Sequence, residues 1–370
     1  MRIGILSTFV GSFGQKGFYN VQEIGLAKEL DKLFDEVIIY KTISKSEKEI
    51  SERVDECYHT TLKLLPTKHL GINGLLNLKQ LDRNLDALIY FSDTQIIVPQ
   101  VYNWCKKNNI KLIPYIGVTE SHSGTKIKRF IINNMFKRNI KIYRKSLCLT
   151  KTPQVRETLE SYGVKACRVA PVGLDLSILK FGYNQVSTLE LKEKWGFKAS
   201  DKIVLFVGRL VQDKEPLRLI EIFEKISFKD SNYKLLIIGK GYLNSEINTL
   251  VREKELQNKV KIIEKIPNTE IWEMYRIADA FVNLSKKEIF GMAILEAMFY
   301  KCKVVAWNAP GPRYIIENGI SGFICETDQE VIDSVLLEKE NLLTVAYERV
   351  MNEFTWKPTA LLINKIVKGL

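Results

Sequence analysis

The stretch Glu288–Met298, which reads EIFGMAILEAM, decides how this chain is interpreted. An apolar run typical of a strand, Ala280–Leu284, precedes it, and a helical pattern follows Gly291. The stretch therefore joins the carboxyl end of a strand to the amino end of a helix, where free backbone N–H groups and a positive dipole end attract an anion. Two carboxylates, Glu288 and Glu296, frame this junction. The pattern favours a ligand with phosphates at one point and hydroxyls on both sides, which describes a sugar nucleotide.

Length and composition are those of a globular protein with two domains. The 370 residues are too many for one ordinary core, and 46% of them are hydrophobic. The sequence has no run of about 18 apolar residues, so no transmembrane helix is expected, and Met1–Ser7 reads as a strand and not as a signal peptide. Six scattered cysteines without paired spacing favour buried reduced thiols over disulfides or zinc ligands. A cytoplasmic protein is expected.

Nearly all the excess positive charge belongs to the first half of the chain. The formal net charge is +12; residues 1–180 carry 28 Lys and Arg against 17 Asp and Glu, whereas residues 181–370 carry 27 against 26. The segment Ser121–Arg156 contains ten basic residues and no acidic one. We therefore expect only the first domain to meet an anionic partner.

Strand-like runs alternate with amphipathic helical runs along the whole chain, which is typical of parallel α/β sheets. The predicted strands are Arg2–Ser7, Glu36–Lys41, Asp86–Phe91, Lys111–Ile116, Ser146–Thr150, Ala166–Ala170, Ile203–Gly208, Lys234–Gly239, Val260–Glu264, Asp279–Leu284, Lys303–Trp307 and Gly322–Cys325. Residues 42–85 show no clear pattern beyond a turn at 71–74, and residues 171–200 read as a linker. The simplest architecture is two doubly wound, Rossmann-like domains that bind ligand at the carboxyl edges of their strands.

The distinctive residues of the second half all follow predicted strands. They are Gly208-Arg209-Leu210 with Lys214, Gly239-Lys240-Gly241, Ile266-Pro267, Glu288–Glu296 and Ala309–Pro312. Because these residues meet at one sheet edge, we expect that edge to bind the ligand. One loop can bring Arg209 and Lys214 to one point, where they would hold a diphosphate without a metal, together with the helix end at Phe290–Ala293. The alternative is two solvated cations near a turn.

Two carboxylates of this edge have competing interpretations. Glu296 lies on a helix otherwise made of apolar residues, so its carboxylate must be paired or bound to a ligand. The hydroxyls of a ribose would satisfy it, and an internal ion pair is the alternative. Glu288 is interpreted as a contact to the sugar, and the alternative is a partner for the helix dipole alone.

In the first half, a glycine-rich turn, Gly11–Gly17, follows the first strand and precedes a predicted helix, Asn20–Leu30. Its glycines, Gly14 among them, allow a ligand to approach the backbone, although the turn is not a G-x-G-x-x-G motif. His122 follows the fourth strand. A single loop histidine is more often structural than catalytic, but the chain has only three histidines.

The basic stretch 126–156 interleaves its charges with apolar residues at helical spacing, namely Ile127, Ile131 and Met135, and Ile132, Phe136 and Ile140. This pattern favours an amphipathic, cationic surface for anionic lipid headgroups. The cations assigned to membrane or acceptor contact are Lys126, Arg129, Lys137, Arg138, Lys141 and Arg144. A plain solvated helix is the alternative. Nucleic acid is disfavoured because no groove-reading or single-strand-binding motif accompanies the charge.

Taken together, these motifs resemble the retaining glycosyltransferases of family 4, which have the GT-B fold. The resemblance covers nearly the whole chain and rests on Gly208-Arg209-Leu210 with Lys214, Gly239–Gly241, Glu288–Met298 and Pro310–Arg313. It implies an α/β fold of two Rossmann-like domains facing a central cleft, residues 1–175 on the acceptor side and residues 176–355 on the nucleotide-sugar side. It also implies that a last helix, residues 356–370, opened by Phe354-Thr355-Trp356, crosses back onto the first domain.

The resemblance implies roles for individual residues. The implied catalytic residues are Arg209, Lys214, Glu288 and His122, and the implied donor-binding residues are Gly14, Gly208, Gly239, Lys240, Ile266, Phe290, Gly291, Met292 and Glu296. The chain departs from the family pattern in two places. Glu215-Pro216 follow Lys214 where the family usually has Gly, and Tyr314 stands where a carboxylate is common.

The implied reaction transfers a sugar from a nucleoside-diphosphate sugar, with UDP favoured, to a saccharide or lipid-linked acceptor, with retention of anomeric configuration. No cofactor and no metal are expected. Front-side attack is favoured because no carboxylate in the motifs is placed as a nucleophile. The implied location is the inner face of the cell membrane. The alternatives are a sugar-nucleotide epimerase on the same fold and a non-catalytic module that binds a sugar nucleotide or a lipid.

Overall fold

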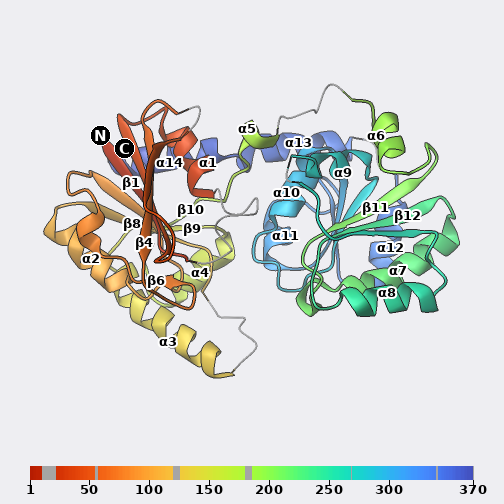
Figure 1. The fold of residues 1–370 in the computed structure, drawn as a ribbon, viewed down its shortest axis with the longest axis horizontal. Coiled ribbons are helices and arrows are strands. Elements are labelled where there is room, and N and C mark those ends of the chain that lie inside the picture. Colours follow the sequence, from red (N-terminus) through yellow and green to blue (C-terminus); the bar gives the residue numbers. More distant parts are fainter. Residues whose placement is uncertain are drawn as a thin grey trace. The chain divides into compact units, whose positions relative to one another are not determined.

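The chain divides into two compact units. The structure, a computed structural model, describes residues 1–10, 22–54, 57–119, 126–179, 186–267, 269–338 and 341–369. Unit 1 comprises Met1–Asp175 and Thr355–Leu370, and unit 2 comprises Leu176–Phe354. In each unit, helices cover a largely parallel sheet (Figure 1). None of the helices in the described ranges combines the length and the apolar character needed to cross a bilayer.

Unit 1 contains an eight-stranded sheet in the order β10-β9-β8-β7-β1-β2-β4-β3. The strands are β1 (Arg2–Ser7), β2 (Glu36–Ser44), β3 (Ile50–Arg53), β4 (Thr60–Thr67), β7 (Ala87–Phe91), β8 (Lys111–Ile116), β9 (Cys148–Thr150) and β10 (Cys167–Val169). Only β3 runs antiparallel to its neighbour. The helices are α1 (Gln22–Leu30), α2 (Val98–Lys107), α3 (Lys126–Tyr143), α4 (Pro153–Ser161) and α14 (Trp356–Lys368). The chain order reverses between β1 and β7, which makes their carboxyl ends the switch point of this sheet.

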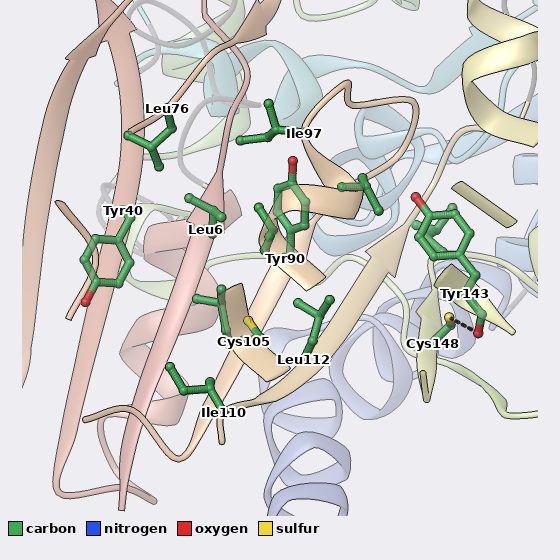
Figure 2. Packing of buried hydrophobic residues seen from close by; sticks show 14 of the residues in the cluster. Leu6, Tyr40, Leu76, Tyr90, Ile97, Cys105, Ile110, Leu112, Tyr143 and Cys148 are labelled. Atoms are coloured by element: carbon green, nitrogen blue, oxygen red, sulfur yellow. Dashed lines mark hydrogen bonds between the residues drawn. The ribbon is translucent and has the colours of Figure 1, made fainter. Parts of the chain in front are cut away.

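Apolar strands explain the core of unit 1. Strand β7 is buried at every position, as expected for a parallel strand covered on both faces. Tyr90 of this strand belongs to one buried cluster with Leu6 of β1, Tyr40 of β2 and Ile97 beside α2 (Figure 2). All six cysteines of the chain are buried and free, so the expectation of reduced thiols is confirmed.

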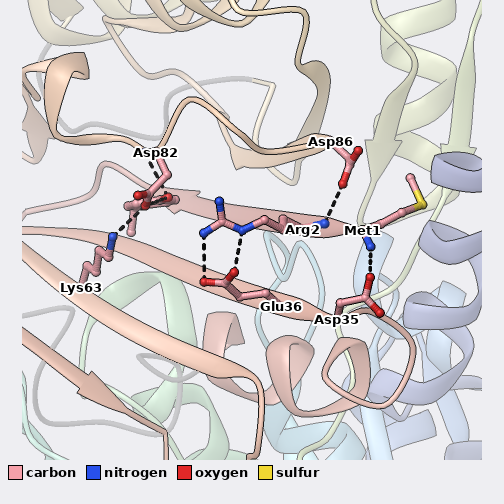
Figure 3. Close-up of polar contacts among 8 residues, drawn as sticks. Met1, Arg2, Asp35, Glu36, Lys63, Asp82 and Asp86 are labelled. Atoms are coloured by element: carbon pink, nitrogen blue, oxygen red, sulfur yellow. Dashed lines mark hydrogen bonds and ion pairs between the residues drawn. The ribbon is translucent and has the colours of Figure 1, made fainter.

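Ion pairs fix the beginnings of the central strands of unit 1. Arg2 and Glu36 face each other as the first residues of β1 and β2, and the guanidinium donates to both carboxylate oxygens at 2.5 and 3.1 Å (Figure 3). The backbone N–H of Arg2 donates to Asp86, and Lys63 pairs with Asp82 at 2.7 Å. These acidic residues therefore already have cationic or N–H partners within the fold.

The last helix, α14, packs on α1 within unit 1, which confirms the predicted return of the chain. A Cβ on Gly25 of α1 would lie 2.4 Å from the indole nitrogen of Trp356, and a Cβ on Gly173 would lie 2.2 Å from the backbone nitrogen of the same tryptophan. Thr359 donates to the carbonyl of Pro171 at 2.8 Å. The two glycines therefore provide the space in which the start of α14 is seated.

Unit 2 contains a six-stranded parallel sheet in the order β13-β12-β11-β14-β15-β16. Its strands are β11 (Lys202–Val207), β12 (Tyr233–Ile238), β13 (Val260–Ile263), β14 (Ala280–Asn283), β15 (Lys303–Trp307) and β16 (Phe323–Cys325). The helices are α5 (Leu176–Leu179), α6 (Thr188–Lys194), α7 (Pro216–Lys229), α8 (Asn244–Glu253), α9 (Ile271–Ile277), α10 (Met292–Phe299), α11 (Pro310–Ile315), α12 (Asp328–Leu336) and α13 (Leu342–Glu353). This is the strand order of a Rossmann domain, with its switch point between β11 and β14.

The structure agrees with most of the predicted elements and corrects two regions. Each of the twelve predicted strands is present, with ends that differ by at most three residues. Residues 42–85, which show no clear sequence pattern, contain β3 and β4. Part of the predicted linker is helical, since α5 and α6 lie within it. Helix α6 starts with a capping box in which Ser187 and Glu190 satisfy each other's backbone N–H groups.

Candidate functional site

The candidate site lies at the switch point of unit 2, where β11 and β14 are neighbours. The chain leaves these two strands in opposite directions, which opens a crevice at their carboxyl ends. The segment after β11 carries Arg209 and Lys214, and the segment after β14 carries Glu288 and Gly291. The fold therefore brings to one place the motifs that the sequence spreads over 83 residues, from Arg209 to Gly291.

The glycines after β11 and β12 allow two loops to touch. Gly239 has φ 148°, and a Cβ on it would lie 1.8 Å from the carbonyl oxygen of Gly208. A Cβ on Gly241 would lie 2.1 Å from the carbonyl of Leu210, whose N–H donates to the carbonyl of Lys240 at 3.1 Å. These glycines hold the loop of Arg209 in place through backbone contact. The Lys240 side chain itself is exposed.

Lys214 ends a short 3-10 turn, Gln212–Lys214, directly before α7. Glu215 follows with φ 54°, a left-handed conformation that glycine adopts more readily, and Pro216 then starts the helix. Glu215 and Pro216, which depart from the family pattern, therefore keep the turn. Glu215 places a side chain in a conformation that favours glycine. Arg209 is exposed, and its guanidinium has no partner among the described residues.

Lys214 and Glu288 form the central contact of the site. The ammonium donates to Oε2 of Glu288 at 2.5 Å, and Asn283 donates to the same oxygen at 3.3 Å. The lysine side chain is 26% exposed and the glutamate side chain 17% exposed, so solvent screens the pair only partly. The two predicted catalytic charges are therefore in direct contact.

Gly291 turns the chain into α10 with φ 104°, and no side chain caps the amino end of this helix. All eight residues of α10 are buried, Met292 among them. Phe290, which precedes the turn, is 8% exposed. The first backbone N–H groups of the helix are therefore held at the sheet edge without a side-chain acceptor, as an anion site requires.

Glu296 lies on the second turn of α10 and is only 7% exposed. Its Oε2 accepts a hydrogen bond of 2.7 Å from the hydroxyl of Tyr275 on α9, and none of the described cations pairs with it. Desolvation raises the pKa of Glu296 to about 7, and the bond from Tyr275 lowers it only in part. The alternative of an internal ion pair is therefore wrong. The neutral partner of the carboxylate, Tyr275, could not be identified from the sequence.

The departure at Pro310–Tyr314 has a structural explanation. These residues form the start of α11, and the N–H of Gly311 donates to the carbonyl of Glu288 at 2.9 Å. The Tyr314 ring lies 6.5 Å from the Phe290 ring and 5.4 Å from the Phe354 ring. Burial among these rings raises the pKa of Tyr314 to about 12. Tyr314 therefore packs in an aromatic cluster that supports the Glu288–Gly291 turn.

Gly311 provides a test of this support. A Cβ at this position would lie 2.1 Å from the carbonyl oxygen of Phe290, which is a backbone atom that cannot rotate away. We expect Gly311→Ala to lower the free energy of unfolding by about 2 kcal/mol, measured by urea denaturation. In Gly208→Ala the nearest atom would lie 3.6 Å away, an ordinary contact, so this control should change stability much less. Equal losses in the two variants would contradict the role of Gly311.

The other predicted site residues are placed as follows. Ile266 is buried beyond the end of β13, on the same sheet edge. Gly14 and His122 lie outside the described residues, as do the side chains of Lys126 and Arg129.

The remaining predicted cations lie on helix α3 or, for Arg144, directly after it. Lys137, Arg138, Lys141 and Arg144 are all exposed. Arg138 donates to the carbonyl of Ile96 at 2.5 Å and Arg144 to that of Tyr162 at 2.8 Å. The assignment of Phe136 and Ile140 to a lipid-facing stripe is wrong. They are 2% and 4% exposed and belong to the core of unit 1, because one face of α3 must cover the sheet.

The sequence interpretation did not single out Lys151, although it follows a predicted strand as the other site residues do. Its ammonium lies 5.5 Å from the centre of the Phe91 ring and 5.6 Å from that of Tyr115, and 3.4 Å from Oε1 of Gln22. A Cβ on Gly117 would lie 2.4 Å from its stem. The fold thus places one cation at the carboxyl edge of the unit 1 sheet, with no carboxylate partner among the described residues.

Comparison with known proteins agrees with this geometry. The model of the family described as glycosyl transferases group 1 matches residues 187–343, all within unit 2. Among curated proteins, the alpha-monoglucosyldiacylglycerol synthase of Acholeplasma laidlawii is 23% identical over 174 residues, which are 47% of this chain and 44% of the synthase. The match thus spans less than half of that relative's own length.

Two solved structures resemble the whole chain. That of Anabaena HepE in complex with UDP and glucose has a TM-score of 0.71 at 16% identity and covers 100% of both chains. That of sucrose-phosphate synthase from Thermosynechococcus elongatus has a TM-score of 0.75 at 16% identity and covers 100% of this chain and 98% of the other. These likenesses confirm the predicted GT-B fold. Over residues 187–343, unit 2 is therefore similar to the glycosyl transferases group 1.

Proposed function

We propose that this protein is a retaining glycosyltransferase that moves a sugar from a nucleoside-diphosphate sugar, with UDP favoured, to a saccharide or lipid-linked acceptor. The observation that carries the proposal is the contact of Lys214 with Glu288 beside the uncapped amino end of α10, at the switch point of unit 2. A cation, a carboxylate and free N–H groups at one edge match a sugar joined to a diphosphate. The complex of HepE with UDP and glucose supports the same class of donor.

Each charge at this edge then has a task in the reaction. Arg209, Lys214 and the amino end of α10 stabilise the negative charge that grows on the departing diphosphate, without a metal. Lys214 has three N–H donors, so it can hold a phosphate oxygen while it keeps Glu288 in place. Glu288 accepts hydroxyls of the transferred sugar, and Glu296 accepts the hydroxyls of the ribose. The departing diphosphate helps to take the proton of the acceptor hydroxyl on the same face of the sugar.

The acceptor side of the proposal rests on unit 1. The exposed cations of α3 support an acceptor held at an anionic surface, and with it a location at the inner face of the cell membrane. A glycolipid or a polyprenyl-diphosphate-linked saccharide fits this requirement. The name of the Acholeplasma relative, a glycolipid synthase, supports this class of acceptor.

The reaction is tested by measuring nucleoside diphosphate released from UDP-glucose and related UDP-sugars, with and without diacylglycerol or a polyprenyl-diphosphate-linked saccharide. The proposal expects release that depends on the acceptor, and a product whose anomeric configuration is that of the donor. An epimerase would convert the UDP-sugar without acceptor and without net release of UDP. A binding module would bind UDP and turn over nothing, and either result would contradict the proposal.

A further inference from the structure

An exposed apolar tip lies at the carboxyl edge of the unit 1 sheet, on the hairpin β5 (His69–Leu70) and β6 (Asn73–Gly74). Leu70 is 66% exposed, Ile72 49% and Leu75 43%. Single exposed apolar residues are ordinary on protein surfaces, but three within six positions form a patch that calls for a partner. Lys68 and Lys79 flank the hairpin and are also exposed.

The hairpin has an ordered turn. Its two central residues are Gly71, with φ 60°, and Ile72, and glycine at the first central position is typical of a type II′ turn. A ring nitrogen of His69 lies 2.8 Å from the carbonyl of Gly71, and the N–H of Leu75 donates to the carbonyl of Lys68 at 2.7 Å. The apolar tip is therefore presented by a defined backbone.

The hairpin is also fastened to the sheet behind it. The N–H of Gly74 donates to the carbonyl of Thr8 at 2.8 Å, and the N–H of Val10 donates to the carbonyl of Ile72 at 2.9 Å. A Cβ on Gly74 would lie 2.7 Å from the hydroxyl oxygen of Thr42, so this strand sits as close to the sheet as glycine permits. The backbone cannot fold back to bury Leu70 and Ile72 without losing these contacts.

The backbone of Ile96 joins the hairpin to the cationic helix α3. The side chain of Asn73 accepts a hydrogen bond from the N–H of Ile96 at 3.1 Å, and Arg138 of α3 donates to the carbonyl of Ile96 at 2.5 Å. Lys137 and Lys141 of the same helix are exposed and have no partner among the described residues. An apolar tip and a row of cations therefore belong to one continuous part of unit 1.

We propose that this part of unit 1 docks on an anionic lipid bilayer, with Leu70 and Ile72 inserted among the acyl chains and the α3 cations on the headgroups. An apolar tip alone would suit many partners, but its attachment to a helix that also carries the unpaired Lys137 and Lys141 favours a surface that is apolar inside and anionic outside. The inference deepens the proposed function by naming the hairpin as the element that holds unit 1 at the membrane of a lipid-linked acceptor. Its test does not require the enzyme to turn over.

The test is co-sedimentation of the full chain with vesicles of phosphatidylcholine alone or with phosphatidylglycerol in equal parts. We expect binding to the mixed vesicles, and a loss of roughly tenfold or more in the partition coefficient for the double variant Leu70→Ser with Ile72→Ser. Lys137→Gln with Lys141→Gln should weaken binding to the anionic vesicles only. Phe228→Ser is the matched control, because Phe228 is 91% exposed on α7 of unit 2 and should not affect binding.

Three results would overturn the inference: no binding of the unmodified chain to anionic vesicles, equal binding by the serine double variant, or an equal loss in Phe228→Ser. Binding of UDP by the double variant serves as the check that the protein is folded. Loss of vesicle binding with unchanged UDP binding supports the hairpin as the docking element. Failure of the unmodified chain to bind UDP would instead contradict the proposed function. It would not change the conclusion drawn from the vesicle experiment.

Discussion

Replacement of Lys214 by alanine is expected to lower the rate of sugar transfer about 10²-fold. Removal of one preorganised contact to a leaving group typically costs about 3 kcal/mol of transition-state stabilisation. In the structure, the substitution also removes a hydrogen-bond partner of Glu288. Glu288 would keep only the 3.3 Å bond from Asn283, because its 2.5 Å partner is gone. The measurement is the turnover number with saturating UDP-sugar and acceptor.

Lys229→Ala is the matched control for this variant. Lys229 ends α7, whereas Lys214 precedes its start, and its side chain is 47% exposed with a 3.5 Å partner in Asp333. Removal of this surface pair should leave turnover close to that of the unmodified protein. A Lys214→Ala variant that keeps more than about half of the normal turnover would contradict the assignment of Lys214 to the leaving group.

Replacement of Glu296 by glutamine is expected to stabilise the ligand-free protein at pH 8 and to weaken its binding of nucleotide. Burial raises the pKa of Glu296 to about 7 in the folded chain, above the ordinary value of 4.5. The folded state therefore favours the protonated acid. Relative to a neutral side chain, Glu296 costs nothing below pH 4.5; its cost grows between pH 4.5 and about 7 and is constant above that. The shift corresponds to about 3 kcal/mol above pH 8.

Urea unfolding of Glu296→Gln and the unmodified chain at pH 5 and pH 8 checks this prediction. The glutamine variant should be more stable at pH 8, and the difference should be small at pH 5. Its affinity for UDP should fall roughly tenfold or more, since an amide replaces the carboxylate that we propose to accept ribose hydroxyls. A variant that is less stable than the unmodified chain at pH 8 would show that Glu296 is not an uncompensated buried acid.

Glu273→Gln is the control for that experiment. Glu273 is the other buried glutamate among the described residues of unit 2, but Lys194 donates to both of its oxygens at 2.7 and 2.8 Å and Trp195 donates at 2.6 Å. Glutamine keeps one acceptor oxygen but puts an NH2 donor in place of the other, and Lys194 loses its ion-pair partner, so the protein should be destabilised. The two substitutions are chemically identical, so opposite signs at pH 8 would isolate the effect of the environment.

The sequence predicts the strands and the binding edge because both follow from local properties. A parallel strand covered on two faces reads as a continuous apolar run, as β7 and β14 do, and ligand residues must follow such runs. Strand β4 has no such signature, because five of its eight residues are partly exposed. It lies between β2 and the exposed strand β3.

The contacts of the site that the sequence does not predict depend on tertiary packing. The bond between Lys214 and Glu288 joins residues 74 positions apart, and that between Tyr275 and Glu296 depends on how α9 packs on α10. The periodicity of α3 indicates an apolar face without indicating what covers it. That face covers the core of unit 1, so we propose the hairpin and the exposed cations for the lipid contact in its place.

The measurement that tests the account most directly is calorimetric titration of UDP into the full chain, with chelator present to remove divalent metal. The account predicts that UDP binds without metal, that Lys229→Ala binds it equally well, and that Lys214→Ala and Glu296→Gln each bind it roughly tenfold or more weakly. UDP that fails to bind, that requires a metal, or that binds both variants as tightly as the unmodified protein would contradict the claim that the carboxyl edge of unit 2 holds a nucleotide sugar.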